Sequence, residues 1–405
     1  MAVPFFVPEI GDDEIAEVID SMKSGWLTTG PKCKQFEQDM AKFLGVKHAL
    51  AVNSATSALH LALEAIGIVE NDLVFVPSMT FTATAEVVRY LNATPVLVDC
   101  QEDSFCIDPE HLRHLIQRLK NNQAVPGVKD PQGKTLKAIM PVHYAGQMAD
   151  VEAISQIAEE FGLEIIDDAA HALPSAYRKD ENSPWIMAGK CAKATALSFY
   201  ANKTMTTGEG GMLLTDDDEI AKRASVMRLH GISRDAWDRF KTAGSWYYEV
   251  VAPGYKYNMT DIAAAIGIHQ LKKITAFRDG RSRGAMLYNQ KLENLAEVLT
   301  PQTLPNRQHA WHIYVLRVLT DKLSIDRDAF IEELTKREIV CSVHYTPLHR
   351  HPYYRDTYNY KAEDFPVTEN ICQQVITLPL FPSITEEQID EVSEAVTEVC
   401  RKYRK

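Results

Sequence analysis

The chain has 405 residues, of which 45% are hydrophobic and 24% are charged, and its formal net charge is −12. This length accommodates two domains and a large core, and the composition is that of a globular protein. The negative charge, with no compensating run of Lys or Arg, disfavours a nucleic-acid partner. No apolar run reaches membrane-spanning length and the N-terminus lacks the basic start of a signal peptide, so we expect no membrane association.

The seven cysteines are scattered along the chain, without a Cys-x-x-Cys pair. This distribution predicts neither a disulfide framework nor a zinc site. A reducing cytoplasm is the compartment that fits it best.

Two helices are predicted at the N-terminus, over residues 10–24 and 33–45, from the spacing of their apolar residues. The loop between them carries an aromatic side chain, Trp26, and the hydroxyls of Thr28 and Thr29. Such a loop either contacts a ligand or packs its aromatic side chain against the core, and composition favours neither alternative.

A predicted strand at residues 48–52 leads through Asn53–Thr56 into an Ala- and Leu-rich helix that ends at Gly67. The free N–H groups and the positive dipole end of that helix meet the hydroxyls of Ser54, Thr56 and Ser57, as in a phosphate-binding turn. An ordinary Ser/Thr N-cap is the alternative, and it is the commoner arrangement.

Apolar strands then alternate with amphipathic helices. The predicted strands cover residues 73–77, 93–99, 136–144, 163–166, 195–200 and 212–215, and the predicted helices cover residues 81–91, 109–120 and 150–161. Strands of this kind predict a mostly parallel sheet covered on both faces. Ligands bind beyond the carboxyl ends of such strands, so the polar residues found there are the candidate site.

Three side chains follow or flank these strand ends. Asp168 is either a turn cap or the partner of a cationic group such as a protonated pyridine nitrogen. His171 is either a core histidine or a hydrogen-bonding partner of a ring substituent. Phe81 either packs against the fold or stacks on a flat cofactor.

Lys203 lies on a polar turn after the strand that ends near Ser198. Most loop lysines are simply solvated. A lysine held beside a pocket has a lowered pKa and forms a Schiff base with an aldehyde. The phosphate turn, Asp168 and Phe81 are the companions that a Schiff-base lysine requires.

The later chain predicts a long helix over residues 261–292 and, from about residue 295, a smaller α+β domain. Within it we expect a strand at residues 310–318, a helix at 327–338 and a strand at 340–345. Four histidines occur in this part, at positions 309, 312, 349 and 351. They lack carboxylate or cysteine companions in register, so we expect no metal site, and one or two of them line the substrate mouth.

Ten segments carry a resemblance to one family, and they occur in its order. They are Gly25–Pro31, Asn53–Leu59, Pro77–Phe81, Pro141–Gly146, Asp168–His171, Ser198–Lys203, Thr207–Met212, Leu229–Arg234, Pro253–Asn258 and His344–Pro347. On these segments the chain resembles the DegT/DnrJ/EryC1/StrS family of nucleotide-sugar aminotransferases. The resemblance implies the α/β fold type I of enzymes that depend on pyridoxal 5'-phosphate (PLP), with residues 1–260 as a large cofactor-binding domain and residues 261–405 as a connecting helix and a small C-terminal α+β domain.

By matching position, the resemblance implies Lys203 as the Schiff-base lysine and Asp168 as the partner of the pyridine nitrogen. His171 then lies near the cofactor oxygen, and Phe81 stacks on the ring. Phosphate-binding positions match Ala55, Thr56 and Ser198. In a homodimer with shared sites, the Gly254–Asn258 loop would reach the neighbouring subunit, where either Lys256 or Asn258 meets the phosphate. Residues expected near the sugar or diphosphate are Thr28, His230, Arg234, His344 and Tyr345.

The resemblance implies transfer of an amino group from L-glutamate to a nucleotide-linked keto-sugar, for cell-surface glycan or lipopolysaccharide biosynthesis. Gly254–Asn258 and Ala310–His312 most resemble the branch that aminates C4 of UDP-linked sugars. A C3 aminotransferase using dTDP- or GDP-linked sugars is one alternative. A homologue that binds sugar or cofactor without turnover is the other. Dehydratases of the family carry histidine at the lysine position, so Lys203 favours transamination.

Overall fold

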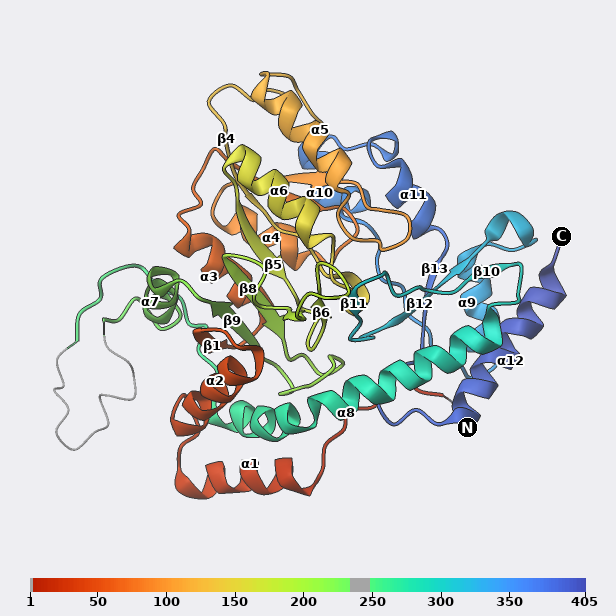
Figure 1. Ribbon diagram of the computed structural model, residues 1–405, viewed down its shortest axis with the longest axis horizontal. Coiled ribbons are helices and arrows are strands. Elements are labelled where there is room, and N and C mark those ends of the chain that lie inside the picture. The colour runs from red at the N-terminus through yellow and green to blue at the C-terminus, as the bar shows by residue number, and fades with distance from the viewer. Residues whose placement is uncertain (1–2, 234–247) are drawn as a thin grey trace.

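The computed structural model describes residues 3–233 and 248–405. At its centre lies a seven-stranded sheet with the order β1-β9-β8-β5-β4-β2-β3 (Figure 1). The strands are β1 (His48–Val52), β2 (Asp72–Pro77), β3 (Thr94–Val98), β4 (Thr135–Ile139), β5 (Glu164–Asp168), β8 (Ala194–Ser198) and β9 (Gly211–Thr215). Within this sheet β9 runs antiparallel to both neighbours, and the other registered pairs are parallel. The mostly parallel sheet predicted from the sequence is therefore confirmed.

Both faces of the sheet are buried. Along β2, Leu73 and Phe75 join one apolar cluster whereas Val74 and Val76 join another. The covering helices are α2 (Pro31–Leu44), α3 (Ala55–Ala65), α4 (Ala83–Tyr90), α5 (Pro109–Lys120), α6 (Val151–Phe161) and α7 (Asp218–Met227). Helices α3, α4 and α7 pack on one face, and α5 and α6 pack on the other. This double burial explains why the strands are apolar at successive positions.

A long helix, α8 (Asp261–Leu292), connects the large sheet to a second, three-stranded sheet (Figure 1). That sheet contains β10 (Val298–Leu299), β12 (Tyr314–Val318) and β13 (Val375–Leu378), and helices α9 (Arg327–Thr335) and α12 (Glu386–Tyr403) lie beside it. Midway along α8, the buried Arg281 donates hydrogen bonds to the carbonyls of His312 and Leu380, both at 2.8 Å. The guanidinium of α8 therefore fixes the chain that enters β12.

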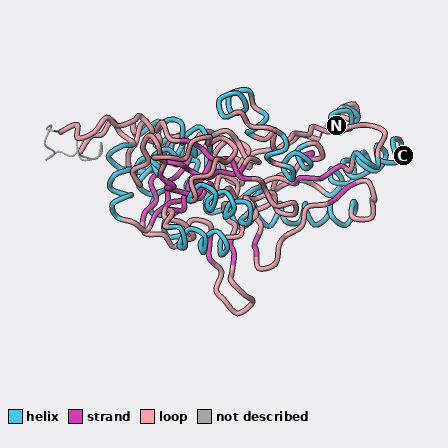
Figure 2. Tube along the Cα trace, turned by 90° about the horizontal axis from the view of Figure 1, so that it is seen from above, coloured by secondary structure: helices cyan, strands magenta, loops and turns pink. Residues whose placement is uncertain are grey.

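The two ends of the chain lie at the same end of the molecule (Figure 2). Val3 forms a parallel bridge with Ile339, and helix α1 (Asp12–Ser24) packs along α8. Residues 348–365 return to the large sheet, where Leu348, Tyr360 and Phe365 join its core. The division of the chain at residue 260 stays a prediction.

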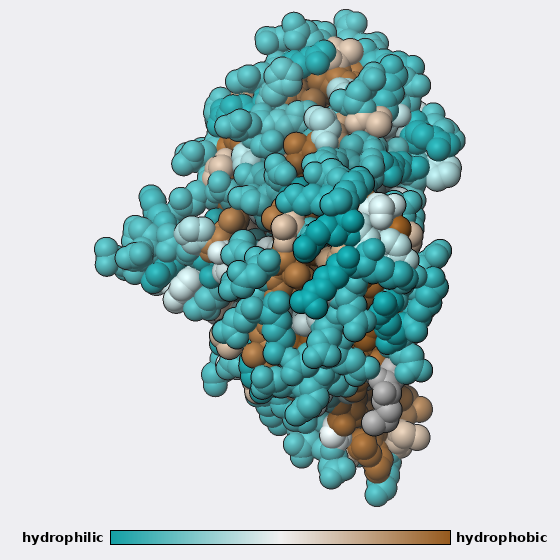
Figure 3. Space-filling view, turned by 90° about the vertical axis from the view of Figure 1, so that its right-hand side faces the viewer, coloured by the Kyte–Doolittle hydropathy of each residue, from teal (hydrophilic) through white to brown (hydrophobic). Residues whose placement is uncertain are grey.

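The face that carries the C-terminal part is mostly hydrophilic, with apolar residues in small patches and one larger group at its lower end (Figure 3). None of the described helices is long and apolar enough to cross a membrane.

The sequence predictions differ from the structure in three strands. The strand predicted at 136–144 ends at Ile139, and residues 144–146 form a single 3-10 turn. The strand predicted at 310–318 begins only at Tyr314, because Ala310 and His312 donate their N–H groups to Gly146 and Ala145 instead of to a sheet. The strand predicted at 340–345 is wrong: Ser342 makes an isolated bridge to Thr377, and the segment otherwise runs as a loop.

Several elements had no counterpart in the sequence prediction. They are helices α7 and α12, the short helices α10 (Pro352–Tyr358) and α11 (Pro366–Cys372), strand β13, and the short strands β6 (Ala176–Tyr177), β7 (Ile186–Met187), β10 and β11 (Arg307–Gln308).

Candidate active site

A cavity of about 330 Å³ opens at the carboxyl ends of the parallel strands. It is lined by residues from the β1–α3 turn, from the ends of β5 and β8, and from the loop at residues 344–345. Of the residues predicted for the site, it brings together Ala55, Thr56, Phe81, Asp168, His171, Ser198, Lys203, His344 and Tyr345. The position and the size are those of a small-molecule site in an open α/β sheet.

Asp168 ends strand β5 at the floor of the cavity and is 5% exposed. Its Oδ2 accepts a hydrogen bond from the Thr84 hydroxyl at 2.8 Å, and its Oδ1 accepts one from the Ala170 N–H at 3.1 Å. Burial raises the pKa of Asp168, whereas these hydrogen bonds and the charge of Lys203 lower it. A cation placed against Asp168 would compensate the buried carboxylate.

Lys203 reaches the same cavity from the turn that follows β8. Burial lowers the pKa of Lys203 to about 8, although the nearby charge of Asp168 acts in the opposite direction. An amine with this pKa is partly neutral at physiological pH. Lys203 is therefore able to act as a nucleophile and to exchange protons.

Three histidines and a tyrosine surround Lys203. The Nε2 atom of His312 lies 3.4 Å from the lysine Nζ, and the rings of His171 and His312 are 4.4 Å apart. His171 accepts a hydrogen bond from the Ala145 N–H at its Nδ1, so its Nε2 carries the proton and donates to the Tyr345 hydroxyl at 2.8 Å. Burial lowers the pKa of His171, His312 and His344, and the charge of Lys203 lowers it further. We therefore treat all three imidazoles as neutral.

The β1–α3 turn forms one wall. Ser54 caps α3 by accepting a hydrogen bond from the Ser57 N–H at 3.1 Å. The first N–H groups of the helix, at Ala55 and Thr56, have no partner within a helix and point out of its N-terminus. A side chain at Gly211 would meet the backbone of Ser54 at 2.3 Å, so only glycine allows β9 to approach the turn. The N-cap expected from the sequence is therefore present, and phosphate binding by this turn stays a prediction.

Phe81 and Ser198 complete the cavity. Phe81 is 59% exposed, and its ring centroid lies 6.1 Å from that of Tyr345, so one face of the ring is open to a ligand. Ser198 ends β8, and its hydroxyl accepts a hydrogen bond from the Tyr200 N–H at 3.4 Å.

The remaining predicted residues do not line this cavity. Thr28, His230 and Lys256 are exposed, and Asn258 donates a hydrogen bond to the Thr29 hydroxyl at 2.7 Å. Lys256 in turn donates to the side chain of Asn258 at 2.6 Å. Arg234 lies outside the described residues. The roles expected for these five residues stay predictions.

The sequence did not single out three residues of the site. Thr84 holds Asp168, His312 contacts Lys203, and Asn202 lines the cavity with its Oδ1 buried and without a hydrogen-bond partner among the described residues. Thr84 lies one helical turn after Phe81, so the spacing of the predicted helix held a signal for it. His312 had none, because the fold alone brings it to Lys203.

The sequence profile described as the DegT/DnrJ/EryC1/StrS aminotransferase family matches residues 8–397. The chain belongs to this family. The aminotransferase is 42% identical over 400 residues to the spore coat polysaccharide biosynthesis protein SpsC of Bacillus subtilis, covering 98% of this chain and 97% of SpsC.

Solved structures share the fold of the aminotransferase. The PLP form of the sugar aminotransferase Spr1654 from Streptococcus pneumoniae is 31% identical, with a TM-score of 0.85 and 99% of both chains covered. DesI, solved in the presence of its TDP-sugar product, is 26% identical, with a TM-score of 0.82 and coverage of 97% of this chain and 91% of DesI. These likenesses confirm the fold type I architecture and the membership among PLP-dependent sugar aminotransferases that the sequence predicted.

The residues that line the cavity fit pyridoxal phosphate, independently of these likenesses. The group requires an amine for its aldehyde, an anion for its ring nitrogen and donors for its phosphate. Lys203, the buried Asp168 and the N-terminal N–H groups of α3 supply these three in one cavity. The buried, unpartnered Oδ1 of Asn202 adds a hydrogen-bond acceptor that the protein itself leaves unused.

Proposed function

We propose that the aminotransferase moves the amino group of L-glutamate to the keto carbon, preferably C4, of a nucleotide-linked sugar, preferably UDP-linked. Polysaccharide or lipopolysaccharide biosynthesis in the cytoplasm is the pathway class that we assign to it. The observation that carries the proposal is the meeting of the Lys203 amine and the buried Asp168 carboxylate in one cavity. The biosynthetic role of SpsC and the TDP-sugar product of DesI support the substrate class.

When bound, pyridoxal phosphate supplies an aldehyde that takes up the donor's amino group and a ring that accepts the electrons left when the donor loses a proton. Asp168 keeps the ring nitrogen protonated, because a buried carboxylate favours a cation beside it. Lys203, with its lowered pKa, would take up and release the substrate's proton at its Nζ. His171 and Tyr345 orient the ring through their hydrogen-bonded pair. The N–H groups of Ala55 and Thr56, with the Ser198 hydroxyl, hold the phosphate.

Space for the rest of the substrate adjoins this site. A second cavity of about 730 Å³ shares Thr80, Phe81 and Tyr345 with the first. Arg89 lines it beside Glu86, and the Arg89 guanidinium also donates a hydrogen bond to the Ala93 carbonyl. A guanidinium suits a diphosphate, which supports a nucleotide-linked sugar in preference to a free one.

We further propose a homodimer in which each active site is completed by the partner chain. Lys256, Asn258 and His230 lie outside the cavity of their own chain, and the strand-like pairing of residues 229–232 with 250–257 holds this surface together. A neighbouring chain would bring the Lys256 ammonium and the Asn258 amide to a phosphate that they do not reach within their own chain. The seven cysteines, none of which is in a disulfide, support a reducing compartment.

A panel of substrates tests the proposed reaction. The purified holoenzyme is incubated with L-glutamate and 3-keto or 4-keto sugars linked to UDP, dTDP or GDP, and products are identified by mass and NMR. We expect amination at C4 of a UDP-sugar and none with Lys203→Ala. Amination at C3 would replace the proposed C4 position, and amination of dTDP- or GDP-sugars alone would replace the proposed UDP link. An enzyme that binds the sugars but shows no amine transfer from any donor would establish the non-catalytic alternative.

A complementation experiment tests the shared site. Lys203→Ala and Lys256→Ala chains are each expected to be nearly inactive. When they are mixed under conditions of subunit exchange, random pairing restores one complete site in half of the dimers, or about a quarter of wild-type activity. Sites built within single chains would give no recovery.

A further inference from the structure

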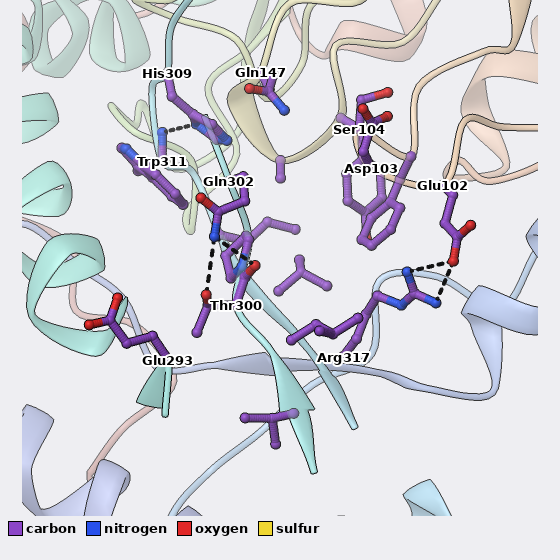
Figure 4. Close-up of a pocket in the computed structure, with 18 residues that line it drawn as sticks. Glu102, Asp103, Ser104, Gln147, Glu293, Thr300, Gln302, His309, Trp311 and Arg317 are labelled. Atoms are coloured by element: carbon purple, nitrogen blue, oxygen red, sulfur yellow. Dashed lines mark hydrogen bonds and ion pairs between the residues drawn. The ribbon is translucent and has the colours of Figure 1, made fainter. Parts of the chain in front are cut away.

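A third cavity, a crevice of about 710 Å³, lies between the large sheet and the C-terminal part of the chain (Figure 4). One wall comes from residues 102–105 and 144–147, and the other comes from residues 293–302 and 309–317. Its lining shares no residue with the active-site cavity, so the proposed reaction does not account for it.

The floor of the crevice is apolar and aromatic. Phe105, Tyr144, Trp311, Ile313 and Val315 line it and are each buried. The Trp311 ring stacks on His309 with 4.0 Å between centroids and 11° between planes. A floor of this kind accepts a ligand ring with an apolar face.

One donor on this floor, the Nε2–H of the buried His309, has no acceptor among the described residues. His309 is 7% exposed, and its Nδ1 accepts a hydrogen bond from the Trp311 N–H at 2.8 Å. Burial lowers the pKa of His309 to about 3, so the ring is neutral and its Nε2 carries the proton. No residue that the structure describes accepts a hydrogen bond from this Nε2–H. The donor is available to a ligand hydroxyl in the crevice.

The rim carries an excess of negative charge. Its charged residues are Glu102, Asp103, Glu293 and Arg317. The guanidinium of Arg317 is occupied by Glu102, at 3.1 Å, and by the Gln374 side chain, at 3.0 Å. The carboxylates of Asp103 and Glu293 have no hydrogen-bond or ion-pair partner among residues 3–233 and 248–405, and they flank the crevice in Figure 4. Such a rim attracts a cation and repels phosphates.

We propose that this crevice is a regulatory binding site for an amino sugar in its ammonium form, without phosphate. The apolar floor takes the face of the sugar ring, the Nε2–H of His309 meets a hydroxyl, and Asp103 and Glu293 attract the ammonium group. A nucleotide-linked sugar does not fit this chemistry, because its diphosphate would face the acidic rim.

The crevice and the active site share a wall. Ala145 lines the crevice, and its N–H donates to His171 while its carbonyl accepts from the His312 N–H at 3.0 Å. Tyr144 also lines the crevice, and its hydroxyl donates to the carbonyl of His344. A ligand that moves this wall therefore moves the imidazoles around Lys203. An aminotransferase with this arrangement would sense amino sugars, the chemical class to which its own product belongs.

Calorimetry on the full-length holoenzyme tests the site at about pH 6.5, where a sugar amine is protonated. The probes are D-glucosamine and its uncharged counterparts N-acetyl-D-glucosamine and D-glucose. We expect glucosamine to bind and the neutral sugars to bind about tenfold more weakly. The double variant Asp103→Asn/Glu293→Gln removes both free charges and should weaken glucosamine binding about tenfold.

Matched variants locate the effect. Glu391→Gln/Glu394→Gln removes two carboxylates from the far surface of α12 and should leave binding unchanged. Leu299 is 46% exposed at the rim, so Leu299→Arg places a cation there at little cost to folding and should weaken binding more than Leu299→Gln does.

Saturation with glucosamine is expected to shift the visible absorbance of the bound cofactor. The proposed site would be overturned by any of three results: no binding of glucosamine, equal binding of the neutral sugars, or unaltered binding of glucosamine by the Asp103/Glu293 variant. Binding that leaves the absorbance unchanged would overturn its regulatory role. The inference does not rest on the proposed keto-sugar, since the titration stands whether or not the substrate panel succeeds.

Discussion

Replacement of Lys203 by Met is expected to stabilise the cofactor-free protein at pH 7. In this state the lysine ammonium is partly buried in the cavity, and loss of hydration there is the main cause of its lowered pKa. A group whose pKa is lower in the folded chain than in the unfolded chain opposes folding while it is protonated. For a lysine, this penalty is complete below the folded pKa and disappears as the pH rises past the unfolded pKa.

The magnitude follows from the two pKa values. A fall from 10.5 to about 8 corresponds to about 3.4 kcal/mol at pH 7. At pH 9 the folded chain has lost most of this proton, and the penalty falls to about 2 kcal/mol. The attraction of Asp168 is already contained in this shift, and loss of the lysine's contact with His312 offsets part of the gain. We therefore expect Lys203→Met to raise the free energy of unfolding by about 1–3 kcal/mol at pH 7, and by roughly 1.3 kcal/mol less at pH 9.

Denaturant unfolding of the cofactor-free protein at the two pH values measures this difference. The exposed Lys256→Met is the matched control, with an expected change within about 0.5 kcal/mol at either pH. A difference between Lys203→Met and wild type that stays constant or grows from pH 7 to pH 9 would refute the reasoning, as would a destabilised Lys203→Met protein.

Three further substitutions probe the site and its support. Asp168→Asn should leave the fold intact but lower kcat by about a hundredfold or more, measured by glutamate half-reaction kinetics; near-wild-type turnover would remove Asp168 from its role. Thr84→Val removes the hydroxyl that donates to Asp168 and should raise the pKa of that carboxyl, which the pH dependence of the cofactor absorbance reports. Thr84→Ser keeps the hydroxyl and should retain the wild-type profile. Identical profiles for all three proteins would contradict the contact. Asp261→Ala leaves the N–H groups of Gly30, Lys32 and Cys33 without their acceptor, so the free energy of unfolding should fall by about 3 kcal/mol in denaturant titrations, and a loss below about 0.5 kcal/mol would show that water replaces the carboxylate.

Local signals in the sequence were enough to predict much of the sheet and its helices. Helix α5 begins and ends as predicted, because Asp108 caps it and Pro109 occupies its first turn. Helix α8 is likewise bounded as predicted, with Thr260 as its N-cap. At β4, by contrast, apolar residues continue past Ile139 into a buried loop that holds the active site, and composition does not distinguish the two.

The residues around Lys203 were predictable to different degrees. Asp168, Phe81 and the Ser54–Thr56 turn each follow a strand, so the sheet alone places them at one edge. His312 was counted only among four scattered histidines, yet it contacts Lys203 across 109 residues of chain. Its position depends on the carbonyl of Ala145 and the guanidinium of Arg281, which are tertiary contacts without a local sequence pattern.

Helix α8 sets the distance between the two sheets. Asp261, its first residue, accepts hydrogen bonds from the start of α2. Arg281, twenty residues further on, donates to the carbonyl of His312, just before β12. One residue added between them would rotate the far half by about 100° and advance it by about 1.5 Å. The number of residues between these two side chains therefore determines where His312 lies relative to the large sheet. We expect deletions or insertions there to be tolerated far less than changes in the loops at either end.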